Sequence, residues 1–124
     1  MALTEEKKAK WEETLRELEL LNEGETIEDH TAGDSWSWTG QTRGNYFFTK
    51  DKHIFVSGFG IDNFVIKYND IKAIKKCFVG QFIPTGIKVT ALNEKGKEKK
   101  YKISVMKRNN WIQLLETKSG VTCS

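Results

Sequence analysis

The amino-acid sequence predicts a mainly β domain of the α+β class, with about seven short antiparallel strands between two helices. Three observations carry this prediction. The spacing of apolar residues changes from 3.6 to 2 near Gly24, turn-forming residues separate the later apolar runs, and no such run exceeds five residues. Runs this short exclude a membrane-spanning helix. The 124 residues, 38% of them hydrophobic, suit one domain with a buried core.

The first predicted element is an extra N-terminal amphipathic helix over roughly residues 4–22. Thr4 precedes two glutamates and can cap the helix N-terminus, where negative side chains are favoured. Gly24 is well placed to end the helix. Spacings of four, three and three residues form one apolar stripe: Trp11, Leu15, Leu18 and Leu21. This stripe must be buried against the rest of the domain or against a second copy of the chain.

The predicted strands are short segments set apart by turn residues. The first two flank a long polar loop, residues 33–44, which carries Trp36 and Trp38. The last two form the clearest hairpin, because apolar and polar residues alternate on both sides of a turn at 93–96. The predicted strands are residues 25–32, 45–49, 53–57, 64–68, 71–78, 87–92 and 100–105.

A C-terminal helix follows the last predicted strand. Asn109 and Asn110 are expected to cap it, and Gly120 is expected to end it. Seven strands in chain order leave open edges unless the sheet curls into a barrel or folds into two packed sheets. Trp111 and Leu115 would then plug one mouth of that barrel. The expected divisions of the chain are an N-terminal helix (1–23), a β domain (24–120) and a tail (121–124).

This order of elements resembles the pleckstrin-homology-like superfold, a split barrel of seven meander strands capped by a C-terminal helix. The local sequence is similar to the GRAM and bacterial branches of that superfold. Residues 44–49 (GNYFFT) with 51–55 (DKHIF) resemble the hairpin of those branches. Residues 66–71 (IKYNDI) resemble the entry into their fifth strand, with Lys67 where proline is commoner. Gly86 and Trp111 also fit, and the resemblance covers roughly residues 24–118.

The resemblance implies a non-catalytic domain, most simply a bacterial one, that needs no cofactor. Domains of this kind bind lipid headgroups, peptides or partner proteins, or they oligomerise. Their phosphoinositide-binding members place several cations at the first hairpin, where these converge on phosphates. In this chain only Arg43 lies in that loop, with Lys50 later and Asp34 nearby. The sequence therefore does not predict phosphoinositide binding by that route.

Charge is divided unevenly along the chain, whose formal net charge is +3. Residues 1–30 carry four basic and ten acidic side chains, whereas residues 31–124 carry sixteen basic and seven acidic ones. A basic body can attract anionic lipid, nucleic acid, an acidic protein or the acidic N-terminal helix itself. One hypothesis is that this helix docks on the basic face of the same domain or of a second copy.

Two sets of residues are candidates for binding a ligand or partner. The indoles of Trp36 and Trp38 either anchor the loop at an interface or cover the barrel mouth. The lysines either contact an anionic membrane or form a solvated sheet face. The lysines expected on one outer face are Lys88, Lys100 and Lys102, extended by Lys72 and Lys76, and those at the turn are Lys95, Lys97 and Lys99. Aromatic residues are not interleaved with them, which argues against nucleic acid.

Catalytic and metal sites have little support. His30 and His53 lie on predicted strands without companions at metal-ligand spacing, and Glu28 is expected to form a surface salt bridge with His30. Cys77 and Cys123 also lack a metal-binding spacing, so we expect a reduced cytoplasmic protein, free or peripheral to a membrane.

The sequence therefore predicts a non-catalytic module for protein interaction or self-association, either free in the cytoplasm or beside a membrane. Its expected interaction surface comprises Trp11, Leu15, Leu18, Lys88, Lys100 and Lys102. The alternative is peripheral binding of anionic lipid, for which the candidates are Arg43, Trp36, Trp38, Lys95, Lys97 and Lys99. Salt-sensitive binding to vesicles would favour the lipid. A catalytic or metal role for His30 or His53 is a third hypothesis, which turnover or metal retention would support.

Overall fold

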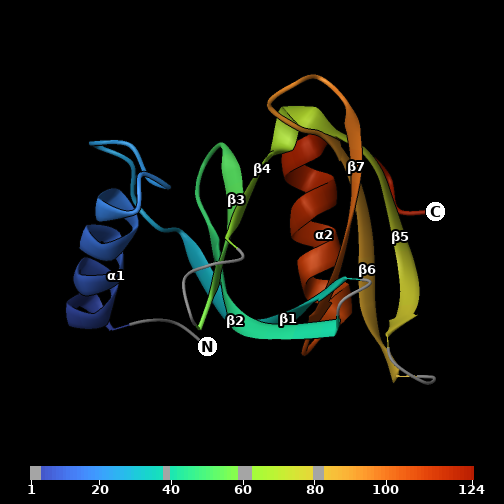
Figure 1. The fold of residues 1–124 in the computed structure, drawn as a ribbon, viewed down its shortest axis with the longest axis horizontal. Helices are drawn as coiled ribbons and strands as arrows, with labels where there is room; N and C mark the ends of the chain where they lie inside the picture. The colour runs from blue at the N-terminus through green and yellow to red at the C-terminus, as the bar shows by residue number, and fades with distance from the viewer. Residues whose placement is uncertain (1–3, 38–39, 59–62, 80–82) are drawn as a thin grey trace.

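A computed structural model describes residues 4–37, 40–58, 63–79 and 83–124 (Figure 1). Their helices are α1 (Glu5–Glu17), the 3₁₀ turn η1 (Tyr68–Asp70) and α2 (Arg108–Ser119). Their strands are β1 (Asp29–Ser37), β2 (Gly40–Phe48), β3 (Lys52–Ser57), β4 (Phe64–Lys67), β5 (Ile71–Val79), β6 (Ile83–Leu92) and β7 (Glu98–Val105).

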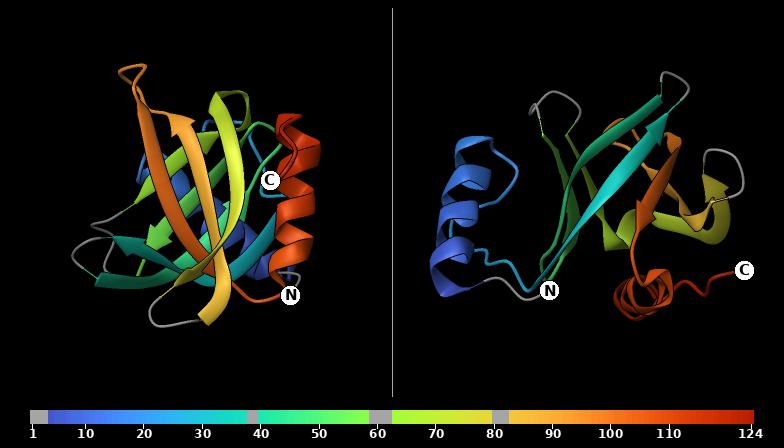
Figure 2. Two further views of the ribbon diagram at one scale, coloured as in Figure 1. Left: turned by 90° about the vertical axis from the view of Figure 1, so that its right-hand side faces the viewer. Right: turned by 90° about the horizontal axis from the view of Figure 1, so that it is seen from below.

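The strands form one antiparallel sheet in the order β4-β3-β2-β1-β7-β6-β5. The first and last strands along the chain, β1 and β7, pair in the middle of this sheet. The sheet is bent, so that β5, β6 and β7 lie across the interior from β2, β3 and β4 (Figures 1 and 2). The predicted order of seven antiparallel strands with an N-terminal and a C-terminal helix is therefore confirmed.

The main core lies inside the bent sheet and is closed by α2. Ile112 and Leu115 of α2 are buried against it, and Trp111 stacks on Phe48 with ring centroids 4.8 Å apart. The predicted role of this helix as the plug of the barrel is confirmed. Gly120 ends α2 in the left-handed conformation, as expected. The cap was predicted wrongly, because Lys107, also left-handed, precedes the helix in place of Asn109 or Asn110.

A second core joins α1 to the outer face of β2 and β3. Leu15 of α1 is fully buried with Phe47 and Ile54, and the ring of Trp11 lies 4.8 Å from that of Phe47. Strand β3 is consequently buried on both faces, which explains its continuous run of buried residues. The helix packs on strands of its own chain, away from the lysines of β6 and β7.

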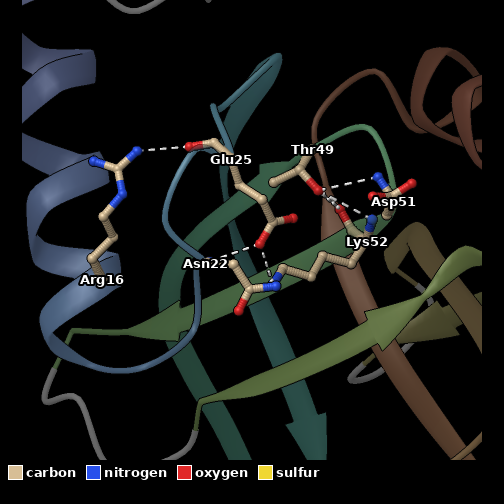
Figure 3. A network of polar contacts seen from close by, with 6 residues as sticks. All are labelled: Arg16, Asn22, Glu25, Thr49, Asp51 and Lys52. Carbon is tan, nitrogen blue, oxygen red and sulfur yellow. Dashed lines mark hydrogen bonds and ion pairs between the residues drawn. The ribbon is translucent and has the colours of Figure 1, made fainter.

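Glu25 fixes the segment between α1 and β1 in this position (Figure 3). Its carboxylate accepts hydrogen bonds from Lys52 Nζ at 2.8 Å and from the backbone N–H of Asn22 at 2.7 Å. Its backbone carbonyl accepts a bond from Arg16 Nη2 at 2.7 Å. A further tie comes from Glu12 of α1, which accepts the backbone N–H of Ile27 at 2.8 Å.

The structure confirms Thr4 as the cap of α1 but shortens the helix. Thr4 Oγ1 accepts the backbone N–H of Lys7, whereas α1 ends at Glu17, well before Gly24. Glu19 has a positive φ of 61°, which turns the chain just after the helix. Leu21 is therefore buried as predicted, but as a residue beyond the end of α1. Leu18 falls outside the buried stripe and remains 41% exposed.

The polar loop predicted for residues 33–44 is wrong for the described residues 33–37 and 40–44, which lie in strands. Most of these residues continue β1 and β2, which pair in register from Asp29 opposite Phe48 to Ser37 opposite Gly40. Gly33 and Gly44 stand opposite each other where the sheet bends, and both are required there. A Cβ on Gly44 would lie 2.2 Å from the carbonyl oxygen of Val56, and one on Gly33 would lie 2.6 Å from that of Ser104.

Candidate functional site

A row of lysines crosses the outer face of three neighbouring strands. Lys75 of β5 stands opposite Lys88 of β6, which stands opposite Lys102 of β7. Residues facing each other in this way have Cβ atoms about 4.5–5.5 Å apart. Ile74 and Val89, which precede or follow these lysines in sequence, are fully buried, so the row faces outward. We call Lys75, Lys88 and Lys102 the lysine row.

The lysine row has no ion-pair partner among the described residues. Lys88 and Lys102 are half-buried, as expected when the apolar stems of lysines pack along a sheet and their charged groups remain in water. Like charges directly opposite each other destabilise a sheet. Lys100 adds a fourth cation to the same face, opposite Thr90. This arrangement opposes the stability of the sheet and concentrates positive charge on one face.

The positive charge of this face affects the pKa of the Cys77 thiol. Burial raises the pKa of Cys77, while the neighbouring cations Lys102, Lys88 and Arg108 act in the opposite direction. The net direction is upward, so the thiol stays protonated and is not an activated nucleophile.

Trp36 extends the lysine row onto β1. It stands opposite Lys102 on one side and Gln41 on the other, and it is half-buried. Its indole Nε1 is buried without a hydrogen-bond partner among the described residues. The sequence wrongly placed this tryptophan in a loop, and Trp38 lies outside the described residues. The structure therefore brings one aromatic side chain to the end of the row of cations.

Arg43 lies on the same outer face but is already paired. Its Nε lies 3.5 Å from Asp34 Oδ1, and Gln41 donates a hydrogen bond to the other oxygen of that carboxylate. The arginine side chain is 86% exposed, so the pair is of the weak surface kind. Arg43 is thus partly neutralised, in contrast to the lysine row.

Lys75 was missed by sequence reasoning, which assigned its place to Lys76. A β-bulge between Ile71 and Ala73 inserts one residue and reverses the alternation of the strand. Lys76 consequently stands opposite the buried Ile87, on the other face from the row. Lys72, also expected to extend the row, is an exposed residue within the bulge.

The turn lysines lie at a different place, beside a pocket of about 510 Å³. Lys95 and Lys99 line this pocket together with Lys67, and Lys99 Nζ lies 5.1 Å from the ring centroid of Tyr101. Two acidic residues, Asp70 and Glu94, line it as well. Lys97 is exposed in the turn. The structure therefore separates these lysines from Arg43 and Trp36, which the sequence had grouped with them.

Neither histidine is placed for catalysis or metal binding. His30 Nε2 lies 2.9 Å from Asn45 Oδ1, and Glu28 pairs with Lys118 at 3.0 Å in place of the expected His30. His53 is fully buried among aromatic rings, which lowers its pKa to about 3. Within the described part of the chain, no group of histidine, cysteine and carboxylate side chains could hold a metal ion. None of its helices is long and apolar enough to cross a bilayer.

Sequence comparison finds no matching family model and no matching curated protein. Comparison with solved structures finds the C-terminal domain of an unknown protein from Leishmania infantum, at a TM-score of 0.70 and 19% identity, covering 90% of this chain and 95% of that one. It also finds two DH/PH fragments of PDZ-RhoGEF. One, in complex with human RhoA, has a TM-score of 0.63 and 13% identity over 86% of this chain. The other, in complex with activated RhoA, has a TM-score of 0.60 and 13% identity over 77%.

This chain spans 32% and 30% of those two fragments, about the share that a single domain would occupy. At these identities the likeness concerns the fold alone.

Proposed function

Because the chain has a pleckstrin-homology-like fold, the fold of a binding module, we propose that it is a non-catalytic protein-binding domain that docks an acidic partner on its lysine row. The observation that carries the proposal is the register of Lys75, Lys88 and Lys102. Three cations stand side by side on adjacent strands without a carboxylate between them. A surface whose like charges repel one another, and so destabilise the fold, is typical of a functional surface.

The surroundings of the row support a protein as the partner. The lysines of the row come from neighbouring strands about 4.8 Å apart, which is close to the spacing of about 5–6 Å between side chains one turn apart on a helix. Trp36 at the end of the row is half-buried and supplies an aromatic anchor for a partner. Charge-assisted contacts of this kind give both specificity and rapid association.

The first experiment measures binding of a polyglutamate peptide by the change in tryptophan fluorescence, at low and at high salt. We expect salt-sensitive binding that Lys88→Glu weakens by about tenfold or more, because the substitution replaces attraction with repulsion. The matched control is Lys50→Glu, an equal change of charge at an exposed position in the turn between β2 and β3. Equal affinities of the wild type and Lys88→Glu would overturn the proposal.

The pocket beside the turn lysines favours a second candidate function, peripheral binding of anionic lipid. Lys67, Lys95 and Lys99 converge on a pocket wide enough for a headgroup, although Asp70 and Glu94 offset part of their charge. Flotation with neutral and anionic vesicles tests this candidate. Binding to anionic vesicles that is lost in Lys95→Glu with Lys99→Glu, but kept in Lys88→Glu, would support it. Flotation lost only in Lys88→Glu would contradict it.

A further inference from the structure

The exposed side of α1 carries negative charge, opposite in sign to the lysine row. Burial of Leu15 and the contact of Trp11 with Phe47 turn the apolar side of the helix toward β2 and β3. Glu13, Glu17 and Glu19 remain exposed at the C-terminal half of the helix and just beyond it, and none of them has an ion-pair partner among the described residues. We call these three residues the acidic patch.

We infer that the acidic partner is a second copy of the chain, with the acidic patch of one copy docked on the lysine row of the next. This inference rests on the proposed function of the row. Glu13 and Glu17 are one helical turn apart, so their side chains are spaced to face two neighbouring lysines of the row. Leu18, 41% exposed beside Glu17, provides the apolar contact that Trp36 provides on the other surface.

The two surfaces cannot meet within one copy. In Figure 1, α1 lies at one end of the molecule and β5 and β6 lie at the other. The left view of Figure 2 looks onto β5, β6 and β7, with no helix across them and α1 behind the sheet. The bonds from Glu12 to Ile27 N–H and from Arg16 to the Glu25 carbonyl hold the helix in place. The charge complementarity is therefore satisfied only between copies.

Contact between two different surfaces at opposite ends has a defined consequence for assembly. Such an interface is heterologous: a copy that binds through one surface still has its other surface free, so the growing assembly keeps one free surface of each kind at its ends. Association then proceeds head to tail, giving chains whose length grows with protein concentration and falls with salt.

The test is light scattering on the full chain over a range of protein and salt concentrations. We expect the mean mass of the wild type to rise with concentration at low salt and to fall to that of a monomer at high salt. Lys88→Glu alone and Glu13→Lys with Glu17→Lys are each expected to stay monomeric. Mixed in equal amounts, these two variants retain one intact pair of surfaces, so we expect dimers and nothing larger.

A control variant, Glu5→Lys with Glu6→Lys, changes the charge of α1 equally but at its first turn, and it should assemble like the wild type. A wild type that is monomeric at every concentration would overturn the inference, as would association that survives in both single-surface variants. If the wild type stays monomeric but binds polyglutamate through Lys88, self-association fails while the proposed function stands. If it binds neither, both fail.

Discussion

Lys88 on β6 stands directly opposite Lys102 on β7, and Lys75 stands opposite Lys88 on its other side. Lys88 therefore has a like charge opposite it on each of its two neighbouring strands. For stability alone, an acidic or neutral residue would be favoured at this position. The stability of the domain and the proposed binding of acidic partners consequently favour opposite charges at this one position.

The first prediction concerns this conflict. Lys88→Glu converts two repulsive cross-strand pairs into two attractive ones and should raise the free energy of unfolding by about 0.5–2 kcal/mol. Urea denaturation measures the change, with Lys50→Glu as the comparison. A gain in stability together with a loss of polyglutamate binding separates the two roles, whereas a loss of stability would contradict the assigned register.

The second prediction concerns the bend of the sheet at Gly44. Gly44→Ala places a Cβ against the Val56 carbonyl, where no flexible side chain can yield, and should cost about 3 kcal/mol of stability. Gly58→Ala is the matched control, because its Cβ would meet only the Arg43 carbonyl, at 3.6 Å. We expect the urea midpoint to fall sharply for the first variant and to stay near the wild-type value for the second. Equal midpoints would show that the close approach is absent.

The third prediction follows from the burial of His53. Burial lowers the pKa of this imidazole from 6.5 to about 3. Between these two pH values the imidazole is protonated in the unfolded chain and neutral in the folded chain. The stability associated with His53 is complete above pH 6.5 and decreases as the pH falls from 6.5 toward 3. His53→Phe should remove this decrease. It should also raise stability at neutral pH by about 1 kcal/mol, since both ring nitrogens lack partners within the described structure.

Unfolding free energies measured from pH 7 to pH 5 test this prediction, since carboxylates titrate below that range. A wild type whose stability is constant across this window would show that the His53 ring is hydrated or bonded in solution.

The fourth prediction concerns the pair of Glu25 and Lys52. Burial raises the pKa of Glu25, but the hydrogen bonds from Lys52 and Asn22 outweigh it, and the net pKa lies below the ordinary value of 4.5. The stability from this pair is therefore present above pH 4.5 and is lost as the pH falls through the lowered pKa. Glu25→Gln should cost about 1.5–3 kcal/mol at neutral pH and much less in acid. An equal cost at both pH values would exclude the charge as the cause.

The order of the elements could be predicted because apolar periodicity records which side of a strand or helix is buried. The exceptions are equally instructive. Residues 33–37 and 40–44 are rich in glycine and small polar residues, yet they lie in strands because β1 pairs with β2 and β7 through its backbone. No periodicity marks such a segment.

The candidate site was harder to predict from the sequence. Lys88 and Lys102 follow from strand alternation alone, but Lys75 depends on the bulge after Ile71, which no local pattern announces. The same limit applies to α1. Its acidic and apolar sides are readable in the sequence, whereas the choice of β2 and β3 as its support depends on Phe47, Ile54 and Val56 facing outward.

The placement of α1 also bears on the order in which the protein folds. A helix of 13 residues is marginal on its own in water, and the strand residues that pack in one cluster with Leu15, which are Phe47, Ile54 and Val56, lie more than thirty residues further along the chain. Because α1 is synthesised before these strands, its apolar stripe stays exposed until β3 has left the ribosome. In the folded protein we expect release of α1 to be the local opening that costs the least free energy. Its amide protons should exchange with solvent before those of the barrel do.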